Sequence, residues 1–177
     1  KKPVGKEVVG WDKRLFAYFW PNPSVGYSET EKRTVHFKKG FRALANKIVA
    51  GEPWESSDNE RAIELAQKVF KWGGVIQDNV TADRIRQVMT NALFFREVYP
   101  KAPMNSGWTK IAAFATACME GKQGQHPQVI WDSRVSTAII HRLDRMFLES
   151  SLNAGLLFPN IGIVIGQGGT RPRNLKY

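Results

Sequence analysis

Apolar side chains recur at intervals of three and four residues along much of this chain, and that spacing limits the fold more than any other feature of the sequence. The first such stretch follows Thr34, which can act as the N-cap of a helix, and it stops at Gly51 and Pro53. Its predicted inward residues are Phe37, Phe41, Leu44, Ala45 and Ile48. The spacing therefore predicts an amphipathic helix with one side buried in a core.

Two further stretches have the same spacing. One begins at Ser57, which precedes Glu60 by three residues as in a capping box, and ends at Gly73-Gly74. The other begins at Thr81, and its predicted inward residues are Ile85, Val88, Met89, Ala92 and Phe95. Because almost no segment alternates polar and apolar residues, the sequence predicts an all-α fold. The length of 177 residues and the hydrophobic content of 42% fit one compact helical domain, 1–177.

The two ends of the chain lack helical spacing. Residues 1–33 are rich in aromatic side chains and are interrupted by Pro21 and Pro23, which predicts an irregular arm packed on the core. Residues 160–177 alternate Ile and Val with Gly and then become rich in Gly and Arg. A strap and a tail both fit this last segment.

The charge of the chain indicates the class of partner. There are 26 Lys and Arg residues against 16 Asp and Glu, a net charge of +10. Such an excess attracts polyanions, and nucleic acid is the partner we expect. An anionic membrane is a weaker candidate, because the basic residues are spread along the chain and do not gather on one face of an amphipathic helix.

Other classes of protein are excluded by composition. The single cysteine, Cys118, rules out an internal disulfide and any four-cysteine zinc or iron–sulfur site within one chain. No apolar run approaches the length that spans a bilayer, so a cytoplasmic location is expected. No metal or cofactor is expected, because His126 and His141 have no other candidate ligands beside them in the sequence.

Residues 104–140 hold the side chains best suited to chemistry. A tight turn at residues 105–107 is predicted to lead into a helix whose first turn holds Trp108 and Lys110. A polar, Gly-rich loop follows, and Asp132 stands at the N-cap position of another predicted helix. The free N–H groups of such a turn and helix start are typical phosphate ligands.

Lys110 and Asp132 are the candidates for catalysis. The positive end of the helix dipole disfavours the ammonium form of a first-turn lysine, and burial adds to that effect. Such a lysine is suited to act as an amine nucleophile. A carboxylate at a helix N-cap stays ionised, and it can stabilise a developing cation on a sugar. Each residue alone also fits a structural role, as a solvated lysine or as a helix cap.

The sequences TKIA at 109–112 and IWDSRV at 130–135 resemble the lysine and aspartate elements of the helix-hairpin-helix DNA glycosylases, especially the 8-oxoguanine glycosylase branch. The resemblance implies a helix-hairpin-helix element, a Schiff-base nucleophile at Lys110 and an essential carboxylate at Asp132. Its motif residues lie between Asn105 and Val135.

The resemblance also implies duplex DNA with a modified base as the partner. The residues expected to contact DNA are Asn105, Ser106, Gly107, Trp108, Thr109 and Arg134. Trp108 and Trp131 flank the catalytic candidates and are candidates to stack on an extruded base, with packing in the core as the equal alternative. This chain departs from the family at Ser106 and Trp108, where glycines are usual, and at Arg134, where a histidine is common.

The function implied is that of a DNA N-glycosylase, with or without AP lyase activity. The fragments WTKIAAF and WDSRVSTAI also look like small bacterial proteins with the 8-oxoguanine glycosylase fold. One such group excises glucosylated hydroxymethylcytosine from phage DNA in anti-phage defence, and we favour this substrate narrowly over 8-oxoguanine. The alternative is a non-catalytic helix-hairpin-helix DNA-binding module. An RNA-binding domain is less favoured, because no RNA-recognition motif is present.

Overall fold

The computed structural model describes residues 9–17, 20, 24–117 and 127–132, together with positions 135, 139, 142, 143, 145, 146 and 149. The chain divides into two compact units, Lys1–Ile130 and Trp131–Tyr177. The predictions for Cys118, His126, Arg134, His141 and residues 160–177 lie outside the described residues.

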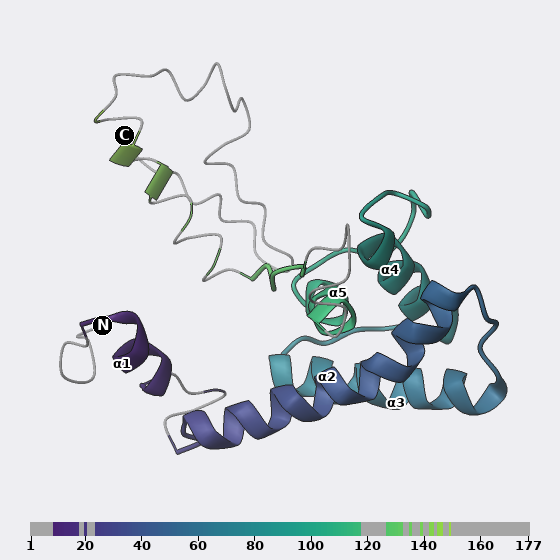
Figure 1. Ribbon diagram of the computed structural model, residues 1–177, viewed down its shortest axis with the longest axis horizontal. Coiled ribbons are helices and arrows are strands. Elements are labelled where there is room, and N and C mark those ends of the chain that lie inside the picture. Colours follow the sequence, from purple (N-terminus) through teal and green to yellow (C-terminus); the bar gives the residue numbers. More distant parts are fainter. Residues whose placement is uncertain are drawn as a thin grey trace. The chain divides into compact units, whose positions relative to one another are not determined.

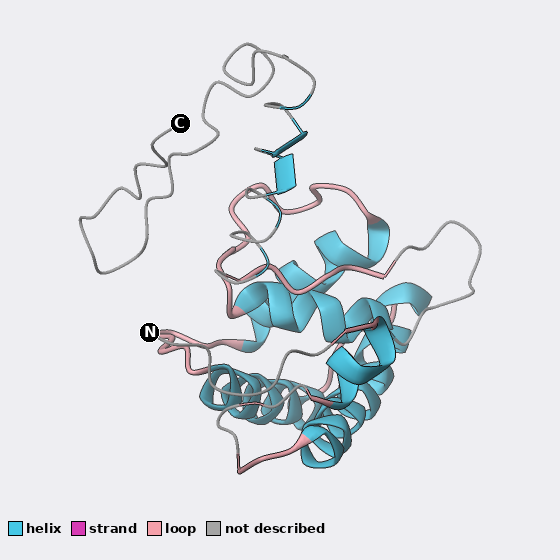
Figure 2. Cartoon of the chain, turned by 90° about the vertical axis from the view of Figure 1, so that its left-hand side faces the viewer, coloured by secondary structure: helices cyan, strands magenta, loops and turns pink. Residues whose placement is uncertain are grey.

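Four packed helices form the core of the first unit (Figure 1): α2 (Tyr27–Ala50), α3 (Ser56–Gly73), α4 (Ala82–Phe94) and α5 (Trp108–Ala117). A short helix, α1 (Trp11–Phe16), precedes them. Helix α5 contacts each of the other three core helices. In the described part of the chain, Figure 2 shows helices and loops and no strand, which confirms the all-α prediction.

Helix α2 begins at Tyr27 and not after Thr34, so its predicted start is wrong. The side chain of Thr30 is buried, and its hydroxyl donates to the carbonyls of Trp20 and Gly26, each at 3.3 Å. The buried side of α2 therefore starts with a hydroxyl group, and the spacing of apolar residues does not reveal it. The predicted irregular arm contains α1 and the first turns of α2.

The N-cap of helix α3 lies two residues before the predicted one. The box is formed by Glu55 and Asp58, and not by Ser57 and Glu60. Asp58 Oδ2 accepts a hydrogen bond from the Glu55 backbone N–H at 2.9 Å and another from Lys47 Nζ at 2.6 Å. The contact with α2 thus helps to select this cap.

Two other helix boundaries are confirmed. Gly74 ends α3 with a φ of +65°, and Thr81 caps α4 by accepting a hydrogen bond from the Arg84 backbone N–H at 3.3 Å. The predicted inward position of Phe95 is wrong. Helix α4 ends at Phe94, and Phe95 adopts a left-handed conformation with 66% of its surface exposed.

Helix α5 lies at the centre of an aromatic cluster. The ring of Phe114 lies 5.3 Å from that of Phe37, 6.4 Å from that of Phe41 and 6.2 Å from that of Trp72. These contacts join α5 to α2 and α3, and they fix the helix that begins at Trp108.

Four of the six basic residues of α2 lie on one side of the helix. Lys32, Lys38, Lys39 and Arg42 are all exposed. At 100° per residue they fall within an arc of about 120°. Among the described residues, no helix is long and apolar enough to cross a membrane.

Candidate functional site

Asn105 organises the turn before α5. Its side-chain Oδ1 accepts hydrogen bonds from the backbone N–H groups of Gly107 at 2.9 Å and Trp108 at 3.2 Å. Its carbonyl oxygen accepts from the Thr109 N–H at 2.9 Å. The N–H groups that were expected to hold a phosphate thus donate within the turn. A phosphate at this place would have to displace the side chain of Asn105.

Gly107 allows α5 to start directly against α3. A Cβ atom at this position would lie 3.0 Å from two ring carbons of Phe70 and 3.2 Å from Asn105 Oδ1. A side chain would therefore push the turn away from α3 or disturb its cap. The glycine expected to contact DNA is also required by the packing of the turn.

Trp108 is a core residue. It is 2% exposed, and its ring meets that of Phe70 edge to face at 4.9 Å between centroids. Its indole Nε1 donates to Gln77 Oε1 at 3.2 Å, so the polar atom is satisfied inside the protein. Of the two candidate stacking residues, Trp131 is the one with an accessible ring, since it is 46% exposed.

Lys110 is buried in the first turn of α5, with 6% of its surface exposed. Its Nζ donates to the carbonyl oxygen of Ser106 at 2.8 Å, and the same carbonyl accepts from Thr109 Oγ1 at 3.2 Å. The aliphatic part of the lysine covers Gly73, where a Cβ would lie 3.0 Å from Lys110 Cε. The amine is thus held at the start of α5 and away from bulk water.

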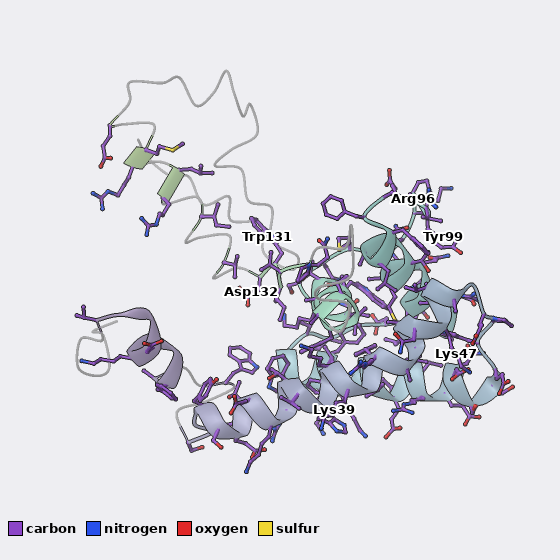
Figure 3. All side chains as sticks on the ribbon, in the orientation of Figure 1. Lys39, Lys47, Arg96, Tyr99, Trp131 and Asp132 are labelled. Carbon is purple, nitrogen blue, oxygen red and sulfur yellow. The ribbon has the colours of Figure 1, made fainter. Side chains whose placement is uncertain are left out.

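Asp132 belongs to the second unit, whereas Lys110 belongs to the first. Its Oδ1 accepts a hydrogen bond from the Val135 backbone N–H at 3.0 Å, and the residue at 135 is helical. This bond confirms the predicted cap. Figure 3 labels Asp132 beside Trp131. The pairing of Asp132 with Lys110 remains a prediction.

A groove of about 440 Å³ lies beside the residues that pack on Trp108. Its lining is mostly polar and comes from the end of α3 and the loop that follows: Gln67, Phe70, Lys71, Val75, Gln77, Asp78, Asn79 and Val80. It shares Phe70 and Gln77 with the packing around Trp108. Within the described ranges, no three His, Cys, Asp or Glu side chains come together as a metal site would require.

Two residues important to this site were not found from the sequence. Gly73 was interpreted only as a helix end, yet its missing side chain makes room for Lys110. Gln77 belongs to no motif, and its role depends on its hydrogen bond with Trp108, which lies 31 residues later in the sequence. Neither role has a local signal, because both depend on how α3 packs against α5.

Comparison with known proteins identifies no relative. No family model matches the chain, no curated protein matches it, and no solved structure matches its fold.

Proposed function

We propose that this protein is a DNA glycosylase of the helix-hairpin-helix class, with Lys110 as its nucleophile and Asp132 as the supporting carboxylate. In this proposal α4, the loop at 95–107 and α5 form the helix-hairpin-helix element. The observation that carries it is the burial of Lys110 in the first turn of α5. A lysine is rarely buried without a function or a partner, because removing an ammonium group from water is costly.

The surroundings of Lys110 favour reactivity. The amine of Lys110 donates a hydrogen bond to the backbone carbonyl of Ser106. The N-terminal end of α5 adds positive potential at this place. This potential disfavours an ammonium group, and a neutral amine is what a nucleophilic step requires.

The proposed reaction begins when the neutral Nζ of Lys110 forms a bond to C1′ of the target nucleotide. The bond from C1′ to the base nitrogen breaks, and the departing base takes the electron pair and a proton. The C1′–O4′ bond then opens, O4′ keeps the electron pair and takes a proton from water, and a protonated imine remains between Nζ and C1′. Loss of a proton from C2′ expels the 3′ phosphate and nicks the strand.

Asp132 has a separate part in this scheme. Its carboxylate would stabilise positive charge that develops on the sugar as the base departs. The exposed ring of Trp131, its neighbour, would stack on the extruded base. If Lys110 does not react, a water positioned by Asp132 would give hydrolysis without strand nicking.

The proposed substrate rests on the resemblance of the sequence to small bacterial proteins. Glucosylated hydroxymethylcytosine in duplex DNA is favoured narrowly over 8-oxoguanine. Excision of the first base would be an anti-phage activity, and excision of the second would be DNA repair.

The test is borohydride trapping of the imine. The protein is incubated with duplexes that carry an abasic site, 8-oxoguanine or glucosylated hydroxymethylcytosine, and reduction then fixes any imine as a stable adduct. We expect an adduct with the wild type and none with Lys110→Gln. Lys101→Gln is the matched control, because Lys101 is an exposed lysine of the loop that precedes α5, and it should give the wild-type yield.

The other outcomes are equally specific. Free base without an adduct would transfer the chemistry to Asp132 and water. If no duplex gives an adduct or free base, the glycosylase proposal is overturned for these substrates. Circular dichroism of Lys110→Gln distinguishes lost chemistry from lost folding.

A second candidate is a DNA-binding module without catalysis. The observation that favours it is that both key side chains have local structural roles: Lys110 binds the carbonyl of Ser106, and Asp132 caps the following helix. In that case Lys110→Gln would change stability, no duplex would lose a base, and unmodified DNA would bind as well as modified DNA.

A further inference from the structure

One side of α2 presents basic residues with almost no acid beside them. From Lys32 to Gly51 the sequence contains no Asp or Glu. Lys32, Lys38, Lys39 and Arg42 are exposed, and we call these four residues the outer cations of α2. Figure 3 shows Lys39 on α2. Lys38 and Arg42 are four residues apart, a spacing at which like charges destabilise a helix.

The outer cations differ from the other basic residues of α2. Arg33 pairs with Glu29 at 3.3 Å, and Lys47 pairs with Asp58 at 2.6 Å. Within the part of the chain that the structure describes, none of the four outer cations forms an ion pair. The four cations are thus not paired with a described carboxylate, and Glu31, which precedes Lys32, is an exposed acid within the same arc.

The packing of α2 indicates what kind of anion it can meet. A helix that binds a lipid surface inserts its apolar side between the headgroups. The apolar side of α2 is unavailable for this, because Phe37, Phe41 and Leu44 are buried in the core. The exposed large apolar side chains of α2 are Val35 and Val49, and at 100° per residue both lie within the arc of the outer cations. Two valines are too few to anchor a helix in lipid, so this side of α2 offers mainly charge, which suits a row of phosphates.

The spacing of the cations also suits a duplex. Lys32 and Arg42 are ten residues apart, or about 15 Å along the helix axis. Duplex DNA carries one charge per about 1.7 Å of its own axis, so several phosphates lie within that length. Long lysine and arginine side chains can reach them without a fixed geometry.

We propose that the outer cations of α2 bind the phosphate backbone of duplex DNA, independently of base sequence and of base modification. This surface is distinct from the turn that holds Lys110, which is buried against α3. It would hold the protein on DNA before any base is selected. The proposal does not depend on the glycosylase reaction, and it stands if that reaction is absent.

The experiment compares two triple variants with the same change in charge. The test variant is Lys38→Gln, Lys39→Gln and Arg42→Gln. The control variant is Arg33→Gln, Lys68→Gln and Arg145→Gln, which removes three exposed cations that each pair with a glutamate four residues away. Both leave 23 basic residues against 16 acidic and lower the net charge from +10 to +7.

Binding to an unmodified, fluorescein-labelled duplex is measured by anisotropy at several salt concentrations. If three phosphate contacts are lost, the slope of log K against log salt should become shallower by about 2.7 in the test variant. The control variant should change this slope by less than about 1. Because the duplex carries no modified base, a failure of the glycosylase proposal does not affect the result.

Three results would overturn the proposal. The first is a wild-type protein that does not bind the duplex. The second is an equal change of slope in both variants, which would mean that only net charge matters. The third is a test variant that no longer binds phosphatidylserine vesicles, which the wild type binds, but still binds DNA as the wild type does. Thermal unfolding of both variants confirms that each is folded.

Discussion

Lys110 and the outer cations of α2 are basic residues on neighbouring helices of one core, yet they are placed in opposite ways. Lys110 is 6% exposed, and its amine is bound to the carbonyl of Ser106. The outer cations are exposed and form no ion pair with a described residue. The first arrangement suits a reaction at one atom, and the second suits attraction over a surface.

The difference comes from the packing of the two helices. Helix α5 is short and buried along most of its length, so even a lysine in its first turn lies in the core. Helix α2 has 24 residues and one buried side, and its other side lies in water. The same residue type therefore acquires a different role according to the helix that carries it.

The largest expected effect concerns the core that holds Lys110. Trp108→Ala should lower the free energy of unfolding by about 3–5 kcal/mol, because it removes a large buried ring. Urea unfolding followed by circular dichroism measures this. Trp131→Ala is the comparison variant, and its effect should be about half as large, since Trp131 is 46% exposed. Equal losses for the two variants would contradict the burial of Trp108.

A second change acts on the position of the amine. Gly73→Ala adds a Cβ about 3.0 Å from Lys110 Cε, so the lysine must shift while the backbone of α3 tolerates alanine. We expect the yield of trapped imine to fall by about tenfold, which corresponds to about 1.4 kcal/mol. Gly26→Ala is the control, because nothing lies within 4 Å of its added Cβ. An unchanged yield in Gly73→Ala would show that the amine needs no fixed position.

A smaller effect is expected where α4 ends. Phe95 has a φ of +49°, a conformation that costs a residue with a side chain about 1 kcal/mol and costs glycine little. Its ring is exposed, so little packing is lost on its removal. Phe95→Gly should therefore raise the stability by up to about 1 kcal/mol in the same urea assay. Destabilisation would mean that the contacts of the Phe95 side chain outweigh the cost of its backbone conformation.

The smallest effect concerns a paired cation. The hydrogen bond between Lys47 and Asp58 raises the pKa of Lys47 and lowers the pKa of Asp58. The lowered pKa stabilises the fold at pH values above 3.8, the ordinary value for Asp58, and this contribution disappears as the carboxylate is protonated in acid. The raised pKa stabilises it below 10.5, and this contribution is lost as Lys47 deprotonates in base.

Asp58→Asn tests this pair through the pH dependence of unfolding. The wild type should be the more stable protein near neutral pH, and the difference should shrink in acid. Glu52→Gln, which removes a carboxylate without such a bond, should show no comparable trend. A difference that persists unchanged in acid would mean that the cap of α3, and not the ion pair, carries the effect.

The sequence predicted those features that depend on local residues. The all-α class followed from the spacing of apolar side chains. The end of α3 at Gly74 and the start of α4 at Thr81 followed from residue types that are common at helix caps. The cap formed by Asp132 was also local, since it spans three residues. Each of these needs no knowledge of what packs against the helix.

The wrong predictions depended on distant contacts or on the loss of helical spacing. Helix α2 starts early because Thr30 bonds back to Trp20, and α3 starts early where Lys47 meets Asp58. Phe95 lies outside because the helix has already ended there. The burial of Lys110 depends on Gly73 of another helix, and no short motif encodes that approach.

If Lys110 and Asp132 act on one sugar, the two side chains must come close together, and a cysteine cross-link measures whether they do. Lys110→Cys and Asp132→Cys are combined in a Cys118→Ser background and treated with a short bifunctional thiol reagent, with and without duplex DNA. Lys47→Cys with Asp58→Cys is the positive control, because these side chains meet in the structure. We expect an intramolecular cross-link between positions 110 and 132. If the control pair cross-links and the pair at 110 and 132 does not, either with or without duplex DNA, the proposal that both residues act on one sugar is contradicted.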